Sequence, residues 1–134
     1  MVLPRDALAH LLDPEADVVL GVYREKRYMQ EGRYLNVHRH LPVDYTMETS
    51  LTADELDCPT DRITVKGGGT GCLMVRTEVF RKLPEPWFRF VDYGNGQHLS
   101  EDLFFCELAR TSGYTVWADT RVRCGHVTRM VVWP

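Results

Sequence analysis

Two adjacent carboxylates, Glu101 and Asp102, are the residues of this sequence best suited to acid–base chemistry. They follow Ser100, a residue type that caps helices, and they precede a helical pattern of apolar residues. The dipole and free N–H groups of a helix N-terminus stabilise a carboxylate as an anion, which can then accept a proton from a hydroxyl. Acidic residues also begin helices in many proteins, so the pair alone favours an ordinary helix start over a general base.

Glycine occupies four of the five positions from Gly67 to Gly71. Glycine contributes no side-chain packing and loses the most backbone entropy on folding, so this density is unfavourable inside a strand. The segment is either a loop that presents N–H groups to a substrate or a bulge or turn between two strands. Its spacing matches neither the phosphate-binding loop nor the dinucleotide fingerprint, and these residues alone favour the turn.

His126 follows the last predicted strand and is a candidate metal ligand. A neutral imidazole ligates a metal through one ring nitrogen. A single histidine is more often a hydrogen-bonded structural residue, so the sequence leaves both roles open.

Three aromatic residues, Trp87, Phe88 and Phe90, gather beside a proline break. They suit an apolar platform for a sugar ring and suit core anchors equally well. Their types and spacing do not separate the two roles.

An uninterrupted apolar run, residues 18–23, is the clearest strand signal. Such a run suits a strand that is covered on both faces, so it favours the α/β class. Between residues 24 and 62 we expect long loops with one or two edge strands, one of them around residues 34–37. Further strands are predicted at residues 63–65, 72–75 and 114–118.

Three helices are predicted to accompany these strands. The first starts at Pro4 and carries Leu8, Leu11 and Leu12 before Pro14 ends it. The second covers residues 78–83 with Thr77 as its cap. The third and best-marked begins after Ser100, has Phe104 and Leu108 along one face, and ends at Gly113.

The composition sets limits on the class of protein. A length of 134 residues with 44% hydrophobic content suits one domain, residues 1–134, and a net charge of -3 argues against nucleic acid as a partner. Of four cysteines without a CxxC pair, Cys72, Cys106 and Cys124 lie in apolar runs and Cys58 does not, which indicates reduced, buried thiols in a cytoplasmic protein. No run approaches the roughly 20 apolar residues of a membrane span.

Five short segments, taken in their order along the chain, together resemble the second half of family 2 glycosyltransferases of the GT-A fold. They are Gly69-Thr70-Gly71 with the segment to Phe80, then Pro86-Trp87-Phe88, Ser100 to Cys106, Gly113-Tyr114 and Gly125-His126. The likeness extends to Met1-Val2-Leu3-Pro4, which is similar to the residues that follow the metal-binding Asp-x-Asp motif. It covers essentially the whole chain.

The resemblance implies a role for each matching residue. Asp102 would be the base that deprotonates an acceptor hydroxyl, and Glu101 would position the acceptor. The donor sugar and acceptor cleft would be lined by Gly69, Thr70 and Gly71, with Trp87 and Phe88 bordering the acceptor. His126 would help to hold a divalent cation, Mn²⁺ or Mg²⁺, that bridges the diphosphate of a nucleotide-sugar donor.

The same resemblance implies a partial GT-A fold, a Rossmann-like mixed sheet flanked by helices. Because no Asp-x-Asp precedes Met1, we expect a C-terminal half whose nucleotide-binding half is missing, with weak or absent sugar transfer alone. The expected acceptor is a glycan, a lipid-linked glycan or a small molecule, and the expected location is the cytoplasm or the inner face of the membrane. A noncatalytic carbohydrate-binding or interaction module derived from this fold is the alternative.

Overall fold

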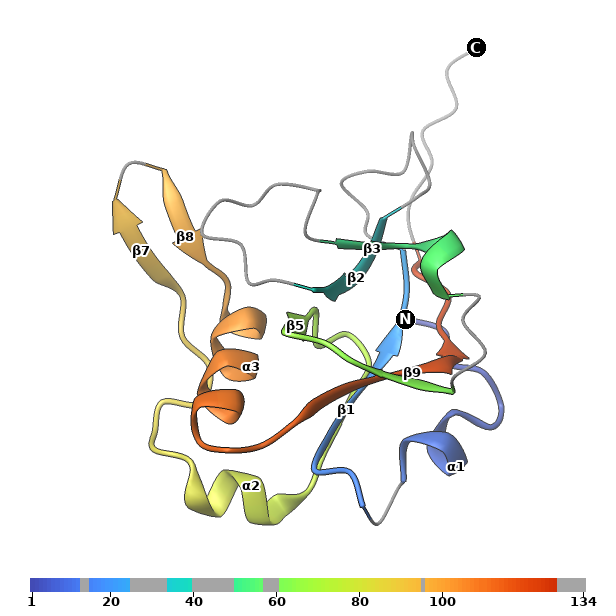
Figure 1. The fold of residues 1–134 in the computed structure, drawn as a ribbon, viewed down its shortest axis with the longest axis horizontal. Helices are drawn as coiled ribbons and strands as arrows, with labels where there is room; N and C mark the ends of the chain where they lie inside the picture. The colour runs from blue at the N-terminus through green and yellow to red at the C-terminus, as the bar shows by residue number, and fades with distance from the viewer. Residues whose placement is uncertain (13–14, 25–33, 40–49, 57–60, 95, 128–134) are drawn as a thin grey trace.

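A computed structural model describes residues 1–12, 15–24, 34–39, 50–56, 61–94 and 96–127 (Figure 1). The predictions for Cys58 and for most of the loops between residues 24 and 62 lie outside this part of the chain. The first elements are α1 (Ala7–Leu11), β1 (Val18–Val22), β2 (Tyr34–His38), β3 (Ser50–Thr52), the 3-10 helix η3 (Ala53–Leu56) and β4 (Arg62–Thr64). The remaining elements are β5 (Gly67–Gly68), β6 (Leu73–Val75), α2 (Thr77–Lys82), β7 (Val91–Gly94), β8 (Gln97–Leu99), α3 (Glu101–Thr111) and β9 (Val116–Arg123).

A four-stranded mixed sheet in the order β4-β9-β1-β6 forms the centre of the fold. Strand β1 pairs in parallel with β9 and antiparallel with β6, while β4 pairs antiparallel with β9. All five residues of β1 are buried, as expected for an apolar strand with neighbours on both faces. The α/β class and the mixed sheet flanked by helices are therefore confirmed.

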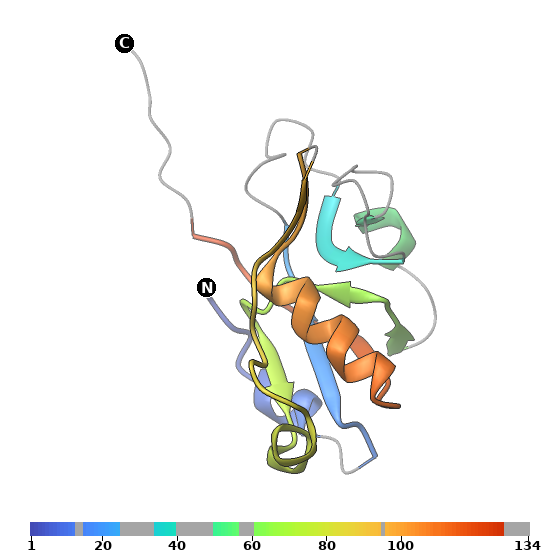
Figure 2. The same cartoon turned by 90° about the vertical axis from the view of Figure 1, so that its left-hand side faces the viewer.

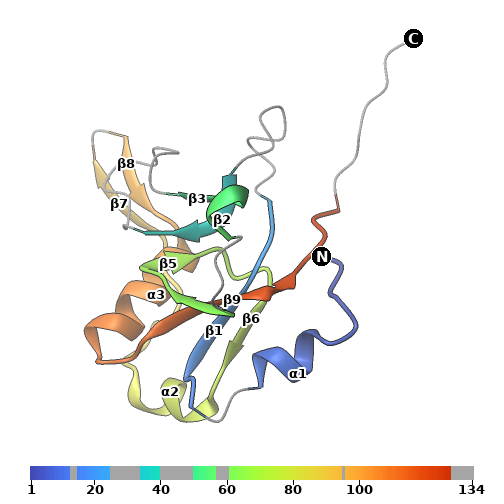
Figure 3. The same ribbon diagram turned by 45° about the vertical axis from the view of Figure 1, so that its right-hand side comes forward.

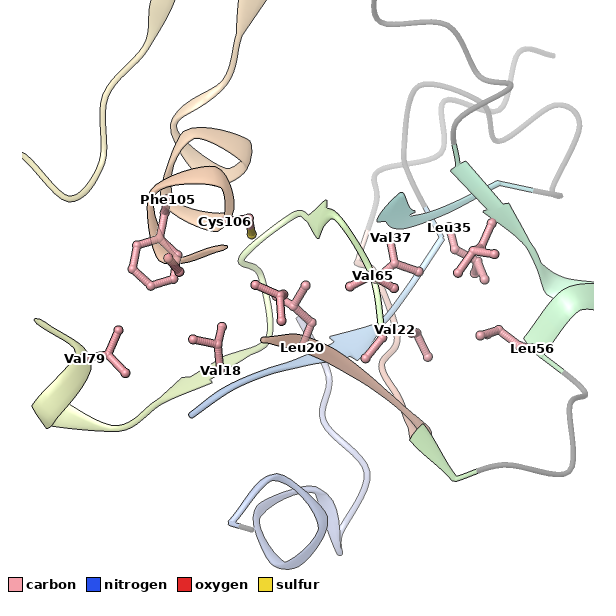
Figure 4. Packing of buried hydrophobic residues seen from close by; sticks show 14 of the residues in the cluster. Val18, Leu20, Val22, Leu35, Val37, Leu56, Val65, Val79, Phe105 and Cys106 are labelled. Atoms are coloured by element: carbon pink, nitrogen blue, oxygen red, sulfur yellow. The ribbon is translucent and has the colours of Figure 1, made fainter. Parts of the chain in front are cut away.

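Alternate residues of β1 serve two separate cores. Val18, Leu20 and Val22 point into the larger one, together with residues of α2, α3 and the second sheet (Figure 4). Val19, and Tyr23 directly after the strand, belong to a smaller core that α1 covers from the opposite face (Figure 3). The period-two alternation of a strand thus produces a layered arrangement with β1 in the middle.

Two smaller β units complete the fold. The second sheet has the antiparallel order β3-β2-β5, and β5 lies under α3. Strands β7 and β8 form a hairpin that extends away from the central sheet and leads directly into α3 (Figure 2). The hairpin and the second sheet therefore lie on either side of the beginning of α3.

Helix α3 has the ends that its sequence predicts. The Ser100 side chain caps it by accepting from the Leu103 N–H at 3.5 Å, and Gly113 takes the left-handed conformation, φ +92°, just after it ends. Phe104 and Leu108, which the sequence places along one face of the helix, are half-buried. The buried side chains are Leu103, Phe105, Cys106 and Ala109.

Two other element starts differ from the prediction. Helix α1 begins at Ala7 rather than Pro4, whose carbonyl accepts the Ala7 N–H at 3.1 Å, and Leu8 is exposed. Thr77 is the first residue of α2, and Arg76 occupies the cap position without a side-chain cap bond.

Strand β9 is longer than the predicted strand. It continues past Ala118 to Arg123, because Asp119 and Thr120 find polar partners that allow them to be buried. None of the helices in the described part of the chain has the length and hydropathy needed to cross a membrane.

Candidate functional site

The carboxylate of Asp102 faces the glycine-rich segment. Asp102 lies in the first turn of α3, and its Oδ1 accepts a hydrogen bond from the Thr70 hydroxyl in the turn between β5 and β6. Asp102 is half-buried, whereas Glu101 beside it is exposed. Adjacent residues of a helix point about 100° apart, so one carboxylate meets the glycine-rich turn and the other meets solvent.

The ring of Tyr23 fills the space that the glycines leave. Its hydroxyl accepts the Gly71 N–H at 3.2 Å, and a Cβ at Gly69 would lie only 2.3 Å from that oxygen. At Gly68, a Cβ would lie 2.8 Å from the Leu20 side chain. The close approach that the glycine density predicts is thus made by other parts of the same chain, and Gly67–Gly68 forms a short strand before the turn.

Asn36 joins three chain segments beneath this turn. It is fully buried, and its amide oxygen accepts the Tyr23 N–H at 2.8 Å. Its amide nitrogen donates to the carbonyls of Gly21 at 3.1 Å and Gly69 at 3.2 Å. The amide is fully engaged, so Asn36 holds the glycine-rich turn in register with β1 and β2.

His126 reaches the same region through Tyr23. Its ring meets the Tyr23 ring edge-on at a centroid distance of 5.2 Å, and its Nδ1 bonds the Arg24 carbonyl at 2.8 Å. A carbonyl only accepts, so Nδ1 carries the proton and Nε2 is the nitrogen left for a metal or a proton. Within the described ranges no group of three or more His, Cys, Asp or Glu residues is placed to hold a metal ion.

The two aromatic residues assigned to the acceptor border have unequal surroundings. Trp87 is half-buried, donates from Nε1 to the Leu83 carbonyl at 3.2 Å and packs on Phe80 at 4.9 Å. Phe88 stacks on Phe105 at 4.9 Å and keeps 42% of its surface exposed. Trp87 therefore anchors the core, while Phe88 also presents a ring to solvent.

Phe88 is also connected to the start of α3. Phe105, on which it stacks, follows Asp102 by three residues, and residues at that spacing are neighbours on a helix. The Phe88 ring is thus linked to the first turns of α3 through Phe105.

The thiol of Cys106 packs beneath the glycine-rich segment. It is fully buried, and its Sγ lies 3.8 Å from the Gly68 carbonyl. Burial raises the pKa of the Cys106 thiol to about 11, so the group is protonated at neutral pH. Cys106 therefore acts as a packing residue rather than a nucleophile, and the predicted burial of Cys72 and Cys124 is likewise confirmed.

The sequence-predicted site residues fall into two groups. In the first group Thr70 bonds Asp102 directly, while Gly69 and Gly71 lie against Tyr23, on which His126 packs. The second group, Glu101, Trp87 and Phe88, has no described contact with these residues. The predictions had named neither Tyr23 nor Asn36. Tyr23 ends an apolar run and indicates only a buried strand, while Asn36 between Leu35 and Val37 has the alternation of a solvent-facing residue.

Comparisons of the chain with protein-family models, with curated proteins and with solved structures find no match. The resemblance to family 2 glycosyltransferases therefore stays a prediction that depends on the residues of the chain itself.

Proposed function

We propose that this chain is the catalytic and acceptor-facing part of a nucleotide-sugar-dependent glycosyltransferase of the family 2, GT-A type. The observation that carries the proposal is the hydrogen bond from Thr70 to Asp102, which aims a half-buried carboxylate at the N-terminus of α3 onto the glycine-rich turn. A base that must collect a proton from a bound hydroxyl needs such a fixed direction.

In the proposed reaction, Asp102 removes the proton of an acceptor hydroxyl. Thr70 donates to Oδ1, which leaves Oδ2 for the acceptor. The hydroxyl oxygen forms a bond to the anomeric carbon of the donor sugar while the bond from that carbon to the diphosphate breaks. The proton stays on Asp102, the electron pair leaves with the nucleotide diphosphate, and direct displacement inverts the anomeric centre. Glu101, the exposed residue that precedes Asp102 in the helix, hydrogen-bonds the acceptor.

A divalent cation, Mn²⁺ or Mg²⁺, would balance the charge of the diphosphate leaving group when bound. His126 fits this group as one ligand, because the Arg24 carbonyl holds the proton on Nδ1 and leaves Nε2 to coordinate. The other ligands would include oxygens of the diphosphate itself.

The proposed partners follow from the resemblance to family 2 glycosyltransferases. The donor is a nucleotide-diphosphate sugar, and the acceptor is a glycan, a lipid-linked glycan or a small molecule that borders Trp87 and Phe88. The reaction would take place in the cytoplasm or at the inner face of the membrane.

The deciding experiment measures transfer of isotope from a panel of nucleotide sugars to glycan acceptors, with Mn²⁺, with Mg²⁺ and with a chelator. We expect slow transfer by the native chain, with a further fall of about a hundredfold or more in Asp102→Asn, the usual contribution of a general base. Glu78→Gln, on the exposed surface of α2, is the matched control and should leave the rate unchanged. Equal rates in native chain and Asp102→Asn would refute Asp102 as the base.

A noncatalytic carbohydrate-binding module is the second candidate, and exposed aromatic rings favour it. Phe90 and Tyr93, at the hairpin, are 58% and 60% exposed and join Phe88 as surface aromatics of the kind on which sugar rings stack. Glycan binding that is equal in the native chain and Asp102→Asn, with no turnover of any donor, would select this candidate. Glycan binding that is unchanged when Phe90 and Tyr93 are replaced by alanine would exclude a binding module of this kind.

A further inference from the structure

A cavity lies at the opposite end of α3 from Asp102. Its volume is about 230 Å³, and three cationic residues, Arg39, Lys66 and Arg110, line it. Arg110 is eight residues beyond Asp102 on the same helix, which corresponds to about 12 Å along the axis. This cavity is therefore separate from the proposed transfer site.

The three cations come from separate parts of the chain. Arg39 follows β2, Lys66 lies between β4 and β5, and Arg110 lies in the last turn of α3. The cavity floor that brings them together is rigid, because the Val65 N–H bonds the Val116 carbonyl at 3.0 Å and both residues are buried. The backbone of Lys66 is also fixed, since its N–H bonds the His38 carbonyl at 2.9 Å.

Carboxylates orient two of these cations without neutralising the whole cavity. Glu55 bonds Arg39, and Glu107 bonds Arg110 at 2.7 Å. A guanidinium has five N–H donors, so each arginine keeps donors for a ligand. Lys66 is exposed and forms no ion pair with a carboxylate of the described residues, so the three cations and their two carboxylate partners together carry one net positive charge.

Neutral donors supplement these charges. The lining also includes the hydroxyl-bearing residues Thr64, Tyr114 and Thr115. Charged and neutral donors that converge from several directions suit a ligand with three or four acceptor oxygens.

We propose that this cavity binds a phosphate group. Its volume is below the roughly 300 to 1,000 Å³ of pockets for drug-sized ligands, so it suits one small oxyanion rather than a long polyanion. The negative dipole end of α3 disfavours an anion, but the Lys66 ammonium and the remaining N–H donors of the two arginines favour one. The ligand is inorganic phosphate or the phosphate of a small ester or lipid headgroup.

The test titrates the isotope-labelled chain with inorganic phosphate at constant ionic strength and follows amide chemical shifts. We expect saturable shifts at residues 64–66 and 110–116, with binding weakened roughly tenfold in Lys66→Met, as for loss of one charge-assisted hydrogen bond. Lys82→Met on α2, 64% exposed, is the matched control and should bind as the native chain does. Circular dichroism checks that each variant is folded.

Two further arms distinguish the source of the phosphate. Glucose 1-phosphate represents a soluble ester, and phosphatidylcholine vesicles with and without phosphatidic acid represent a lipid headgroup. If Lys66→Met weakens binding of glucose 1-phosphate or of the phosphatidic acid vesicles, the phosphate binds in this cavity, and the ligand affected identifies its source. An absence of saturable phosphate binding by the native chain, equal binding by Lys66→Met, or shifts confined to the Asp102 end would overturn the proposal.

Discussion

At the scale of single residues, the environments of Glu101 and Asp102 differ although the two are neighbours in the sequence. The Thr70 hydroxyl meets only Asp102, and it comes from a turn that Tyr23 and Asn36 hold against β1. A hydroxyl on a flexible loop would not hold its partner in one direction. Because Tyr23 and Asn36 fix the backbone of the turn, the Thr70 hydroxyl can hold the Asp102 carboxylate in one orientation. Thr70 is thus a positioning residue in the proposed reaction.

The role of Thr70 is tested by removing its hydroxyl and keeping its shape. We expect Thr70→Val to lower kcat of sugar transfer about tenfold with little change in KM, since one oriented hydrogen bond of this kind contributes roughly 1 to 2 kcal/mol. Thr70→Ser restores the donor and should recover most of the rate. A Thr70→Val variant with native kcat, or a Thr70→Ser variant as slow as Thr70→Val, would contradict the positioning role.

Local signals explain which site residues the sequence could predict. The helix start with its two carboxylates was predicted because caps and acidic residues act within a few positions, while the role of Asp102 as a base stays a prediction from the resemblance. Tyr23 and Asn36 were missed because their partners are distant along the chain, such as Gly71 for Tyr23. Periodicity predicts that a side chain is buried, but it does not tell which backbone the side chain will meet.

At the scale of elements, boundaries set by nearby residues were predicted, and boundaries set by partners distant along the chain were not. Helix α3 has the start and end that Ser100 and Gly113 predict, because capping is satisfied within one turn. Strand β9 was predicted too short, because its extension depends on partners elsewhere. Thr120 donates through both its backbone N–H and its hydroxyl to the Asp61 carbonyl, a contact that no local pattern reveals.

The packing of β1 against the glycine-rich turn yields a prediction at this scale. A Cβ at position 69 would collide with the Tyr23 hydroxyl at 2.3 Å, whereas the ring carbon behind it is 3.3 Å away. Gly69→Ala should therefore lower the free energy of unfolding by about 1 to 3 kcal/mol, as overpacking does in cores. Tyr23→Phe removes the colliding oxygen at the cost of one hydrogen bond to Gly71.

The double variant decides whether that collision is the cause. In urea unfolding, Gly69→Ala should cost less in the Tyr23→Phe background than in the native chain, with a coupling of about 1 kcal/mol. Additive losses would show instead that the alanine disturbs the turn backbone itself and that the Tyr23 hydroxyl is not the obstacle.

At the scale of the whole molecule, a buried ion cluster connects distant segments around the central sheet. Asp119 in β9 is fully buried and accepts from Arg62 in β4 at 3.1 Å and from Arg121 at 2.7 Å. Arg62 also donates to the His10 carbonyl at 2.9 Å, so the cluster joins α1 to the sheet. No residue of it was singled out from the sequence, where Asp119 resembles an ordinary polar break after Ala118.

The charge of Asp119 should make stability depend on pH. Burial raises the pKa of Asp119, but hydrogen bonds from Arg121 and Arg62 outweigh burial and hold that pKa below its ordinary value. A lowered folded-state pKa adds stability above the ordinary carboxyl pKa of about 3.9, and this stability is lost as the pH falls through the folded value. We therefore expect Asp119→Asn to lose about 3 kcal/mol of unfolding free energy at pH 7.

The difference in unfolding free energy between the native chain and Asp119→Asn should shrink as the solution becomes acidic, because protonation of Asp119 removes the charge from the native chain as well. Unfolding by urea between pH 7 and pH 2 should show the two stability curves converging at the acid end. Asp61→Asn is the matched control: its carboxylate also bonds Arg121, at 3.0 Å, but is 67% exposed, so its loss should be under about 1 kcal/mol. A gap between native and Asp119→Asn that stayed constant over this range would mean that shape, and not the ionised carboxylate, stabilises the cluster.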